Sequence, residues 1–295
     1  MQYKKTLGEN AFDWLNCFIM ITVLVITIYP FLHILAVSLN EARDAAAGGI
    51  GIWPRVFSVD SYETVFGFPN IFNAMLVSVA RTLVGTLLSL IVSSAAAYAL
   101  VDNKMKGYKL IYNIFVVSMF VNGGLIPTFM LNLNLGLYDS FWVYILPGMF
   151  SVFNMILFRT YILQLPYELF ESALIDGAGD FRIYAQIIMP LCLPIIATLA
   201  LFVAVNQWNA WRDTLFFTKS ESLETLQYVM MKVIRQAEAA SMAKKARSLL
   251  RPSISVTPES IKMAITIIAT LPILVVYPFL QRFFIKGMVI GAVKG

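Results

Sequence analysis

The sequence predicts an all-α membrane protein with six membrane-spanning helices and both termini in the cytoplasm. Its mean hydropathy is +0.75, and only 13% of its 295 residues are charged, about half the share found in soluble domains. A stretch of about 20 apolar residues is long enough to cross the hydrocarbon layer of a bilayer. Six such stretches run over residues 14–38, 72–99, 109–131, 142–162, 188–211 and 261–284. We expect them to form a single domain over residues 1–295.

The first apolar stretch follows Lys4 and Lys5, as the apolar part of a signal peptide would. It is too long for a signal peptide and further spans follow it, so we expect a membrane span. The net charge of +5 does not indicate nucleic-acid binding, because the basic residues lie in short clusters beside apolar stretches. Clusters in that position are typical of the cytoplasmic ends of spans.

The charges of the connecting segments predict the orientation. Residues 102–109 carry three lysines and the chain from residue 282 onward carries three basic residues, whereas residues 132–141 contain no lysine or arginine. Because basic loops stay on the cytoplasmic side, we expect a cytoplasmic loop at 166–190 and an extracytoplasmic loop at 212–260. The loop at 212–260 is itself basic, but the rule that basic loops stay in the cytoplasm holds poorly for long loops.

Ionisable residues are rare deep inside the predicted spans, where only His33 and Arg81 lie and no carboxylate does. Ion-coupled carriers usually need intramembrane carboxylates, so their absence speaks against a secondary carrier, which is the alternative function. A membrane-bound enzyme or a structural subunit is a further alternative, although no converging catalytic groups are visible. Without a Gly-Lys dipeptide the chain has no P-loop, so energy for uphill transport would have to come from a partner. The cysteines, Cys17 and Cys192, lie in apolar stretches and are expected to be small hydrophobes, and we expect neither a cofactor nor a metal in this chain.

The predicted cytoplasmic loop has the pattern of two short amphipathic helices. Pro166 suits the first turn of a helix. The carboxylate of Glu171 lies near the same end, where the positive end of the helix dipole stabilises it. Gly177 can adopt the left-handed conformation that ends a helix, and Asp180 is a candidate N-cap for the next one. The apolar faces of these helices need a cover, either lipid headgroups or a groove on a protein partner.

This loop resembles the EAA motif of ABC importer permeases, in which E-A-A is followed after three residues by G and after nine more by I-x-L-P. The matching positions, with mild departures at the second and sixth, are Glu171, Ser172, Ala173, Gly177, Ile187, Met189 and Pro190. The stretches "SAAAYALVDNKMKG", "NGGLIPTFMLNLNLGLYDSFWVYILPG" and "YPFLQRFFIKGMVIGAVKG" extend the resemblance over nearly the whole chain. They are similar to the carbohydrate-uptake group of these permeases, on the MalG-like side of a heterodimer and in the YtcP-type branch.

The resemblance implies a type I (MetI-like) permease fold and the import of oligosaccharides derived from complex polysaccharides. It implies a second homologous permease, an ABC ATPase dimer that binds ATP and Mg, and an extracellular solute-binding protein. The chain would form half of the translocation pathway in a bacterial plasma membrane and catalyse no reaction itself. The residues that the resemblance assigns to ATPase coupling are Glu171, Ser172, Ala173, Asp176, Gly177, Ala178, Ile187 and Pro190.

Polar and aromatic residues in the spans are candidates for the sugar pathway. Amides form hydrogen bonds with the hydroxyls of a sugar, and indole rings pack against the apolar C–H faces of the sugar ring. The alternatives are an interfacial aromatic belt for the tryptophan and hydrogen bonds between helices for the amides. Arg81 needs an anionic partner, either a subunit carboxylate or a uronate on the substrate. The candidates are Arg81, Asn122, Asn154, Asn206, Gln207, Trp208 and Asn209.

The predicted extracytoplasmic loop contains helical spacing at Leu226, Met230 and Val233, and is then broken at Pro252. Thr257 is expected to cap the last span, with proline at its first position. The resemblance implies that this loop contacts the solute-binding protein. The alternative is a helix that lies on the membrane surface.

Overall fold

The computed structural model describes residues 6–101, 105–247 and 257–292, and their regular secondary structure is helical apart from one isolated bridge between Asn40 and Phe57. The fold is therefore all-α over these ranges. Contacts divide the chain into two units, one of Met1–Pro69 with Met230–Leu271 and one of Asn70–Val229 with Pro272–Gly295. Predictions that rested on Lys4, Lys5, Lys104, Pro252 and Lys294 lie outside the described residues.

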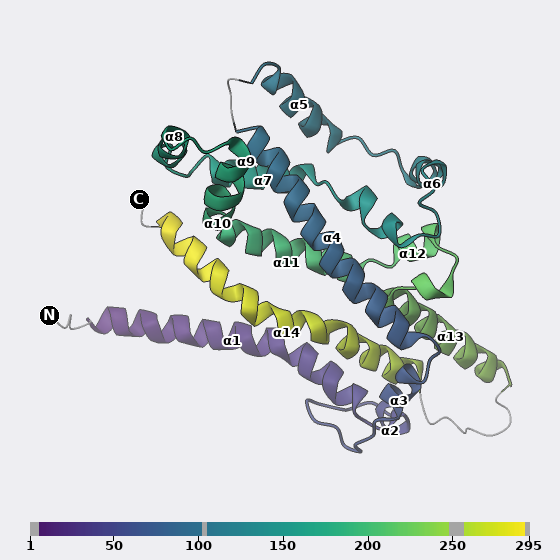
Figure 1. Cartoon of the computed structure of the whole chain (residues 1–295). Coiled ribbons are helices and arrows are strands. Elements are labelled where there is room, and N and C mark those ends of the chain that lie inside the picture. Colours follow the sequence, from purple (N-terminus) through teal and green to yellow (C-terminus); the bar gives the residue numbers. More distant parts are fainter. Residues whose placement is uncertain (1–5, 102–104, 248–256, 293–295) are drawn as a thin grey trace. The chain divides into compact units, whose positions relative to one another are not determined.

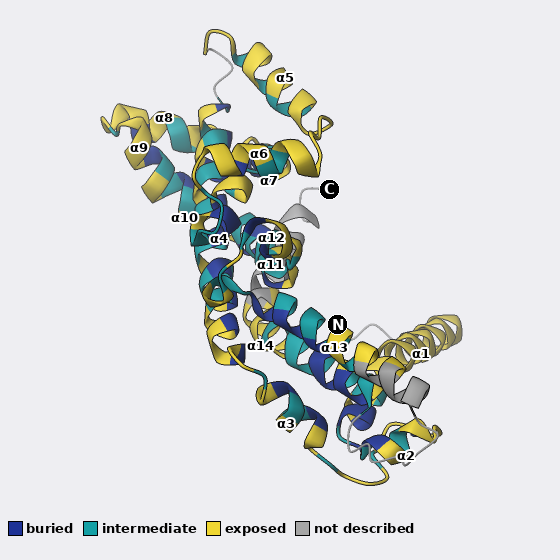
Figure 2. Cartoon of the chain, turned by 90° about the vertical axis from the view of Figure 1, so that its right-hand side faces the viewer, coloured by how far each residue is buried: buried dark blue, intermediate teal, exposed yellow. Residues whose placement is uncertain are grey.

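The first unit begins with α1 (Leu7–Ser38). Thr6 and Glu9 form a capping box, because the Glu9 N–H donates to Thr6 Oγ1 at 3.3 Å and the Thr6 N–H donates to Glu9 Oε2 at 2.7 Å. The helix is exposed from Leu7 to Leu32 (Figure 2). Its apolar surface is suited to lipid or to another subunit.

Asn40 organises the segment that follows α1. Its Oδ1 accepts from the backbone N–H groups of Arg55 and Val56 at 2.7 and 2.9 Å. Its Nδ2 donates to the Asp44 carboxylate at 2.8 Å, which together with Arg55 holds the pKa of Asp44 below its usual value. The short helices of this unit are α2 (Ala42–Ala46) and α3 (Asp60–Phe66).

The second unit is built around α4 (Ile71–Ala99), against which α7 (Val152–Ile162) and α11 (Leu193–Asn209) pack (Figure 1). Phe158 of α7 and Leu199 of α11 are fully buried in the core of the unit. The other helices that lie wholly within this unit are α5 (Tyr108–Ser118), α6 (Leu125–Asn134), α8 (Glu168–Ile175), α9 (Asp180–Ile183), α10 (Met189–Leu191) and α12 (Arg212–Phe217). The 3₁₀ turns are Phe141–Tyr144, Leu146–Gly148 and Glu221–Leu223, and a π-helical turn covers Tyr184–Ile188.

Arg159, which lies in the predicted fourth span, joins α7 to the end of α4. Its Nε donates to the Leu100 carbonyl at 2.8 Å, and its guanidinium donates to the Tyr108 hydroxyl. The same group lies over the rings of Tyr108 and Tyr112, at 5.3 and 5.1 Å. The charge is therefore compensated by a carbonyl, a hydroxyl and two aromatic faces.

Two helices continue past the division between the units, α13 (Leu226–Arg247) and α14 (Pro258–Ala292). The predicted helix in the long loop corresponds to α13, in which Leu226, Met230 and Val233 are buried. The prediction for the start of α14 is confirmed, because Thr257 Oγ1 accepts from the Ser260 N–H at 3.2 Å.

The number of spans differs from the prediction of six. Within the described residues, three helices are long and apolar enough to cross a membrane, Leu7–Ser38, Ile71–Ala99 and Pro258–Phe279. Two bent pairs would raise the number to five: Phe141–Gly148 with Val152–Ile162, bent by 49°, and Asp180–Leu191 with Leu193–Asn209, bent by 79°.

The predicted span 109–131 is not one continuous helix. It consists of the two short helices α5 and α6. Between them Gly124 has φ +81°, and the Asn122 side chain accepts from its N–H at 2.9 Å. A left-handed glycine next to a side chain that bonds to the backbone favours a turn over a helix, which explains the break.

Candidate functional site

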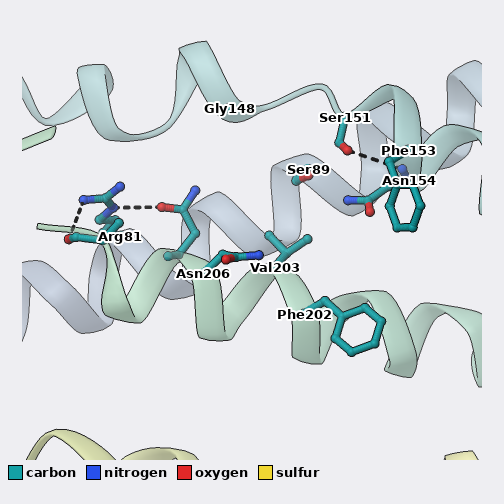
Figure 3. A pocket seen from close by; sticks show the side chains of 11 residues that line it. Arg81, Ser89, Gly148, Ser151, Phe153, Asn154, Phe202, Val203 and Asn206 are labelled. Atoms are coloured by element: carbon teal, nitrogen blue, oxygen red, sulfur yellow. Dashed lines mark hydrogen bonds between the residues drawn. The ribbon is translucent and has the colours of Figure 1, made fainter. Parts of the chain in front are cut away.

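A cavity of about 600 Å³ lies in the second unit, between α4, α7 and α11 (Figure 3). Ser89 comes from α4, Phe153 and Asn154 from α7, and Phe202 and Asn206 from α11. Four of the predicted pathway residues line it, namely Arg81, Asn154, Asn206 and Gln207. The other lining residues are Ser89, Gly148, Ser151, Phe153, Phe202, Val203 and Ala210.

Arg81 lies at one end of this cavity and is held on several sides. Its Nε donates to Gln207 Oε1 at 2.8 Å, and its Nη1 donates to the Ala210 carbonyl at 3.2 Å (Figure 3). Its Nη2 donates to the Asp213 carboxylate. The guanidinium also lies 4.6 Å from the centroid of the Tyr144 ring. Arg81 is only 2% exposed, so these groups replace the water that its charge would otherwise need.

The expected anionic partner of Arg81 is thus a carboxylate of this same chain, 132 residues further on. Sequence reasoning missed Asp213, an acid that lies four residues beyond the end of α11 at Asn209. A carboxylate just beyond one span is a signal for a cation inside another, because a charge in the membrane interior needs a counter-charge within reach.

The opposite end of the cavity offers hydroxyl, amide and aromatic groups. Ser151 caps α7, since its Oγ accepts from the Asn154 N–H at 3.3 Å. The Asn154 side chain extends toward the cavity beside the ring of Phe153 (Figure 3). Phe202 supplies a second ring from α11. Amides and hydroxyls can bond to sugar hydroxyls, and the rings can cover the C–H faces of a sugar.

Three predicted pathway residues lie away from the cavity lining. Asn122 is exposed and accepts from the Gly124 N–H. Trp208 is buried at 5% exposure. Asn209 accepts from Gln227 Nε2 at 3.3 Å. The helical period explains the last two, because neighbouring residues of α11 cannot all face the same side.

The predicted coupling loop is formed by α8, a tight turn and α9. Gly177 has φ +74°, and its N–H donates to the Leu174 carbonyl at 3.0 Å while the Ala178 N–H donates to the Ala173 carbonyl at 3.0 Å. These bonds form a Schellman motif, which confirms that Gly177 ends the first helix. Asp180 was expected to be the N-cap of the second helix, but it is the first helical residue and Gly179 is the cap.

The loop has one buried and one exposed side (Figure 2). Ala173 is buried in the same cluster as Ile183 and Ile188. The large apolar residues Ile175 and Phe181 are 85% and 80% exposed. The remaining predicted coupling residues are exposed, namely Glu171, Ser172, Asp176, Gly177 and Pro190, or half-buried, namely Ala178 and Ile187. A hydrogen bond of 2.8 Å between the hydroxyls of Tyr184 and Ser94 ties the second helix to α4.

A carboxylate outside the spans fastens another loop of this unit. Asp139 Oδ1 accepts from the N–H groups of Lys219 and Ser220 at 2.9 and 2.8 Å, and its Oδ2 accepts from the Ser220 hydroxyl at 2.6 Å. These bonds favour the ionised form and hold the pKa of Asp139 below its usual value. The largest cause is the Ser220 hydroxyl, followed by the two backbone N–H groups. Sequence reasoning did not single out Asp139, whose left-handed φ of 56° is unusual for a residue other than glycine.

No group of three or more histidine, cysteine or acidic residues that could hold a metal ion occurs within the ranges that the structure describes. The apolar helices are those of a helical membrane protein, and the cavity between three of them combines polar and aromatic side chains. Comparison with known proteins assigns the family. The model of the family described as "Binding-protein-dependent transport system inner membrane component" matches residues 7–290. The chain belongs to this family. It is an ABC permease subunit of the cell membrane, and ATP hydrolysis takes place in a partner subunit.

Two curated relatives come from Bacillus subtilis (strain 168). Protein LplC is 39% identical over 98% of this chain and 97% of its own length. The "Polygalacturonan/rhamnogalacturonan transport system permease protein YtcP" is 35% identical over 97% of this chain and 99% of its own length. A subunit of a bacterial ABC transporter "involved in the import of the acidic polysaccharide alginate" has a similar structure, with a TM-score of 0.80 and 25% identity over 96% of this chain and 100% of that one.

Proposed function

We propose that the chain forms half of the translocation pathway of an ATP-driven importer for oligosaccharides that derive from complex polysaccharides. The observation that carries this proposal is the cavity between α4, α7 and α11, which combines amides, hydroxyls and two phenylalanine rings. Such a lining suits a sugar better than a metal ion or a lipid tail. The names of YtcP and of the alginate transporter support the same class of substrate.

The proposal includes the topology and the partners of the chain. Six crossings, with α5 and α6 together as a broken third span, would place both termini and the loop 166–190 in the cytoplasm. The loop 212–260 would then face the solute-binding protein. A second homologous permease would complete the pathway, and an ABC ATPase dimer would bind ATP and Mg.

The ATPase would dock on the exposed side of α8 and α9. Ile175 and Phe181 present apolar side chains there, and the Schellman motif at Gly177 fixes the angle between the two helices. On a pair of short amphipathic helices, such side chains are suited to a groove on a protein partner. Ala173 and Ile183 connect this surface to the buried core of α7 and α11, so that a movement of the loop would reach the cavity walls.

Co-purification with the ATPase tests the coupling site. The chain is expressed with its neighbouring permease and the candidate ATPase and is pulled down in detergent, as wild type and as Ile175→Asp and Phe181→Asp. We expect the ATPase to follow the wild type and to be lost with both variants, because a charge would be buried in the interface. Trp53→Asp is the control, since Trp53 is also 80% exposed but lies in the other unit. ATPase retention by both loop variants would contradict the docking site.

Uptake of a labelled oligosaccharide tests the transport function itself. Cells that carry the complete importer should accumulate the sugar, and the accumulation should stop when ATP is depleted. Uptake that survives ATP depletion and collapses with the ion gradient would favour the alternative, an ion-coupled secondary carrier.

A further inference from the structure

The Gln207 side chain fits into a slot that the absence of a side chain at position 85 creates. A Cβ atom added to Gly85 would lie 2.7 Å from Gln207 Nε2, 2.9 Å from Cδ and 3.3 Å from Cγ. The first two separations are shorter than any ordinary van der Waals contact between such atoms. Gly85 lies inside α4, where glycine costs about 1 kcal/mol relative to alanine. The close approach of Gln207 supplies a physical reason for this glycine.

The orientation of the Gln207 amide is fixed by Arg81. Because Oε1 accepts the Arg81 Nε–H at 2.8 Å, the amide nitrogen must point the other way, and Gln207 lines the cavity. Among the residues that the structure describes, Nε2 donates no hydrogen bond to another protein group. A glutamine amide has two N–H donors, and these are the groups that Gln207 can offer to a ligand.

Arg81, in contrast, is already engaged. Three of its five N–H groups donate to Gln207, the Ala210 carbonyl and Asp213, and the Asp213 carboxylate neutralises its charge. A uronate that bound the guanidinium would have to compete with that carboxylate for the same charge. The remaining lining residues carry no charge.

We infer that Gln207 contacts an uncharged, hydroxylated part of the substrate, and that Arg81, Asp213 and Gly85 are positioning residues that hold its amide in place. This inference rests on the proposed function and names the roles within its cavity. Gln207 donates from Nε2 to a sugar hydroxyl. Arg81 does not bind a charged group of the sugar.

A double-mutant cycle tests the role of Gly85. Uptake is measured at sub-saturating oligosaccharide with the complete importer, normalised to the amount of assembled complex. Gly85→Ala and Gln207→Ala should each lower uptake about fivefold, the effect of one hydrogen bond of about 1 kcal/mol. In the Gln207→Ala background, Gly85→Ala should change uptake by less than about twofold, because the displaced group is gone.

Gly8→Ala is the matched control, since Gly8 also lies in a helix and an added Cβ there meets nothing within 4 Å. It should leave uptake unchanged. An equal loss from Gly85→Ala in both backgrounds, or no loss in either, would overturn the assignment of Gly85 as a positioning residue for Gln207.

The charge of the substrate tests the role of Arg81. Two labelled oligosaccharides of equal length are compared, one neutral and one with uronate units. Arg81→Gln should lower the uptake of the neutral and the uronate sugar by the same factor, and so should Asp213→Asn. Both residues act on the substrate only through the position of the Gln207 amide. A selective loss of the uronate sugar in Arg81→Gln would overturn the inference alone. A wild-type importer that transports neither sugar would overturn the proposed function and the inference with it.

Discussion

The Tyr144 ring lies beneath the Arg81 guanidinium at 4.6 Å, and the hydroxyl of the same tyrosine donates to the Leu223 carbonyl at 2.6 Å. One side chain therefore supports the buried cation and fastens the segment that follows α12 (Arg212–Phe217). An aromatic face that stabilises a desolvated cation contributes up to about 2 kcal/mol.

The two contacts of Tyr144 can be separated by two substitutions. Tyr144→Phe keeps the ring under Arg81 and removes only the hydroxyl, so we expect a loss of about 1 kcal/mol. Tyr144→Leu removes the ring as well and should lose about 1–2 kcal/mol more. Thermal unfolding of the purified protein in detergent measures the difference. Equal melting temperatures for the two variants would show that the ring does not stabilise Arg81.

The ion pair between Arg81 and Asp213 should respond unequally to loss of either partner. The Arg81 side chain is 3% exposed and that of Asp213 is 37% exposed. Asp213→Ala leaves a buried cation without a carboxylate, and we expect a loss that approaches the roughly 3–5 kcal/mol known for broken buried pairs. Arg81→Ala leaves a carboxylate that water can reach, so it should cost less for the charge itself. Melting temperatures of both single variants and of the double variant give the comparison. Asp213→Ala should cost much less in the Arg81→Ala background than in the wild type, and an equal cost in both backgrounds would contradict this account.

Gly177 should tolerate substitution less well than its neighbour Gly179. Gly177 has φ +74°, where a side chain is strained, whereas Gly179 has φ −74° and open space around it. Gly177→Ala should therefore destabilise the turn by about 1–2 kcal/mol, and Gly179→Ala serves as the control. Hydrogen–deuterium exchange of the α8 amides should rise in Gly177→Ala only. Similar exchange in both variants would mean that the turn does not depend on the left-handed residue.

The bonds of Asp139 predict a pH dependence of stability. Because the pKa of this carboxyl is lowered in the folded protein, folding favours the ionised form. The stabilisation is fully present above the usual pKa of 3.8 and is lost as the pH falls through the lower folded value. The difference in melting temperature between the wild type and Asp139→Asn should thus be widest above about pH 5 and should shrink as the pH falls below 3.8. A difference that stays constant over this range would contradict the role of the charge.

The sequence predicted the all-α class, the family and the two short helices joined at Gly177 from local patterns. Apolar length identifies helices such as α1 and α4 because a span needs only its own residues to satisfy its backbone. The turn at Gly177 was also local, since a left-handed glycine after an amphipathic helix ends it without help from distant residues. Asn122 and Gly124 are residues typical of a turn, but the apolar composition of residues 109–131 still predicted one continuous span.

Only the tertiary structure decided which polar side chains meet. Seven pathway candidates had similar sequence signals, yet four of them line the cavity, because the rotation of α4, α7 and α11 about their axes selects one face of each. The counter-charge of Arg81 lies 132 residues away, and the slot for Gln207 depends on the absence of a Cβ on another helix. Contacts of this kind arise from packing between helices, and the local periodicity of one helix carries no information about the residue that faces it from the next.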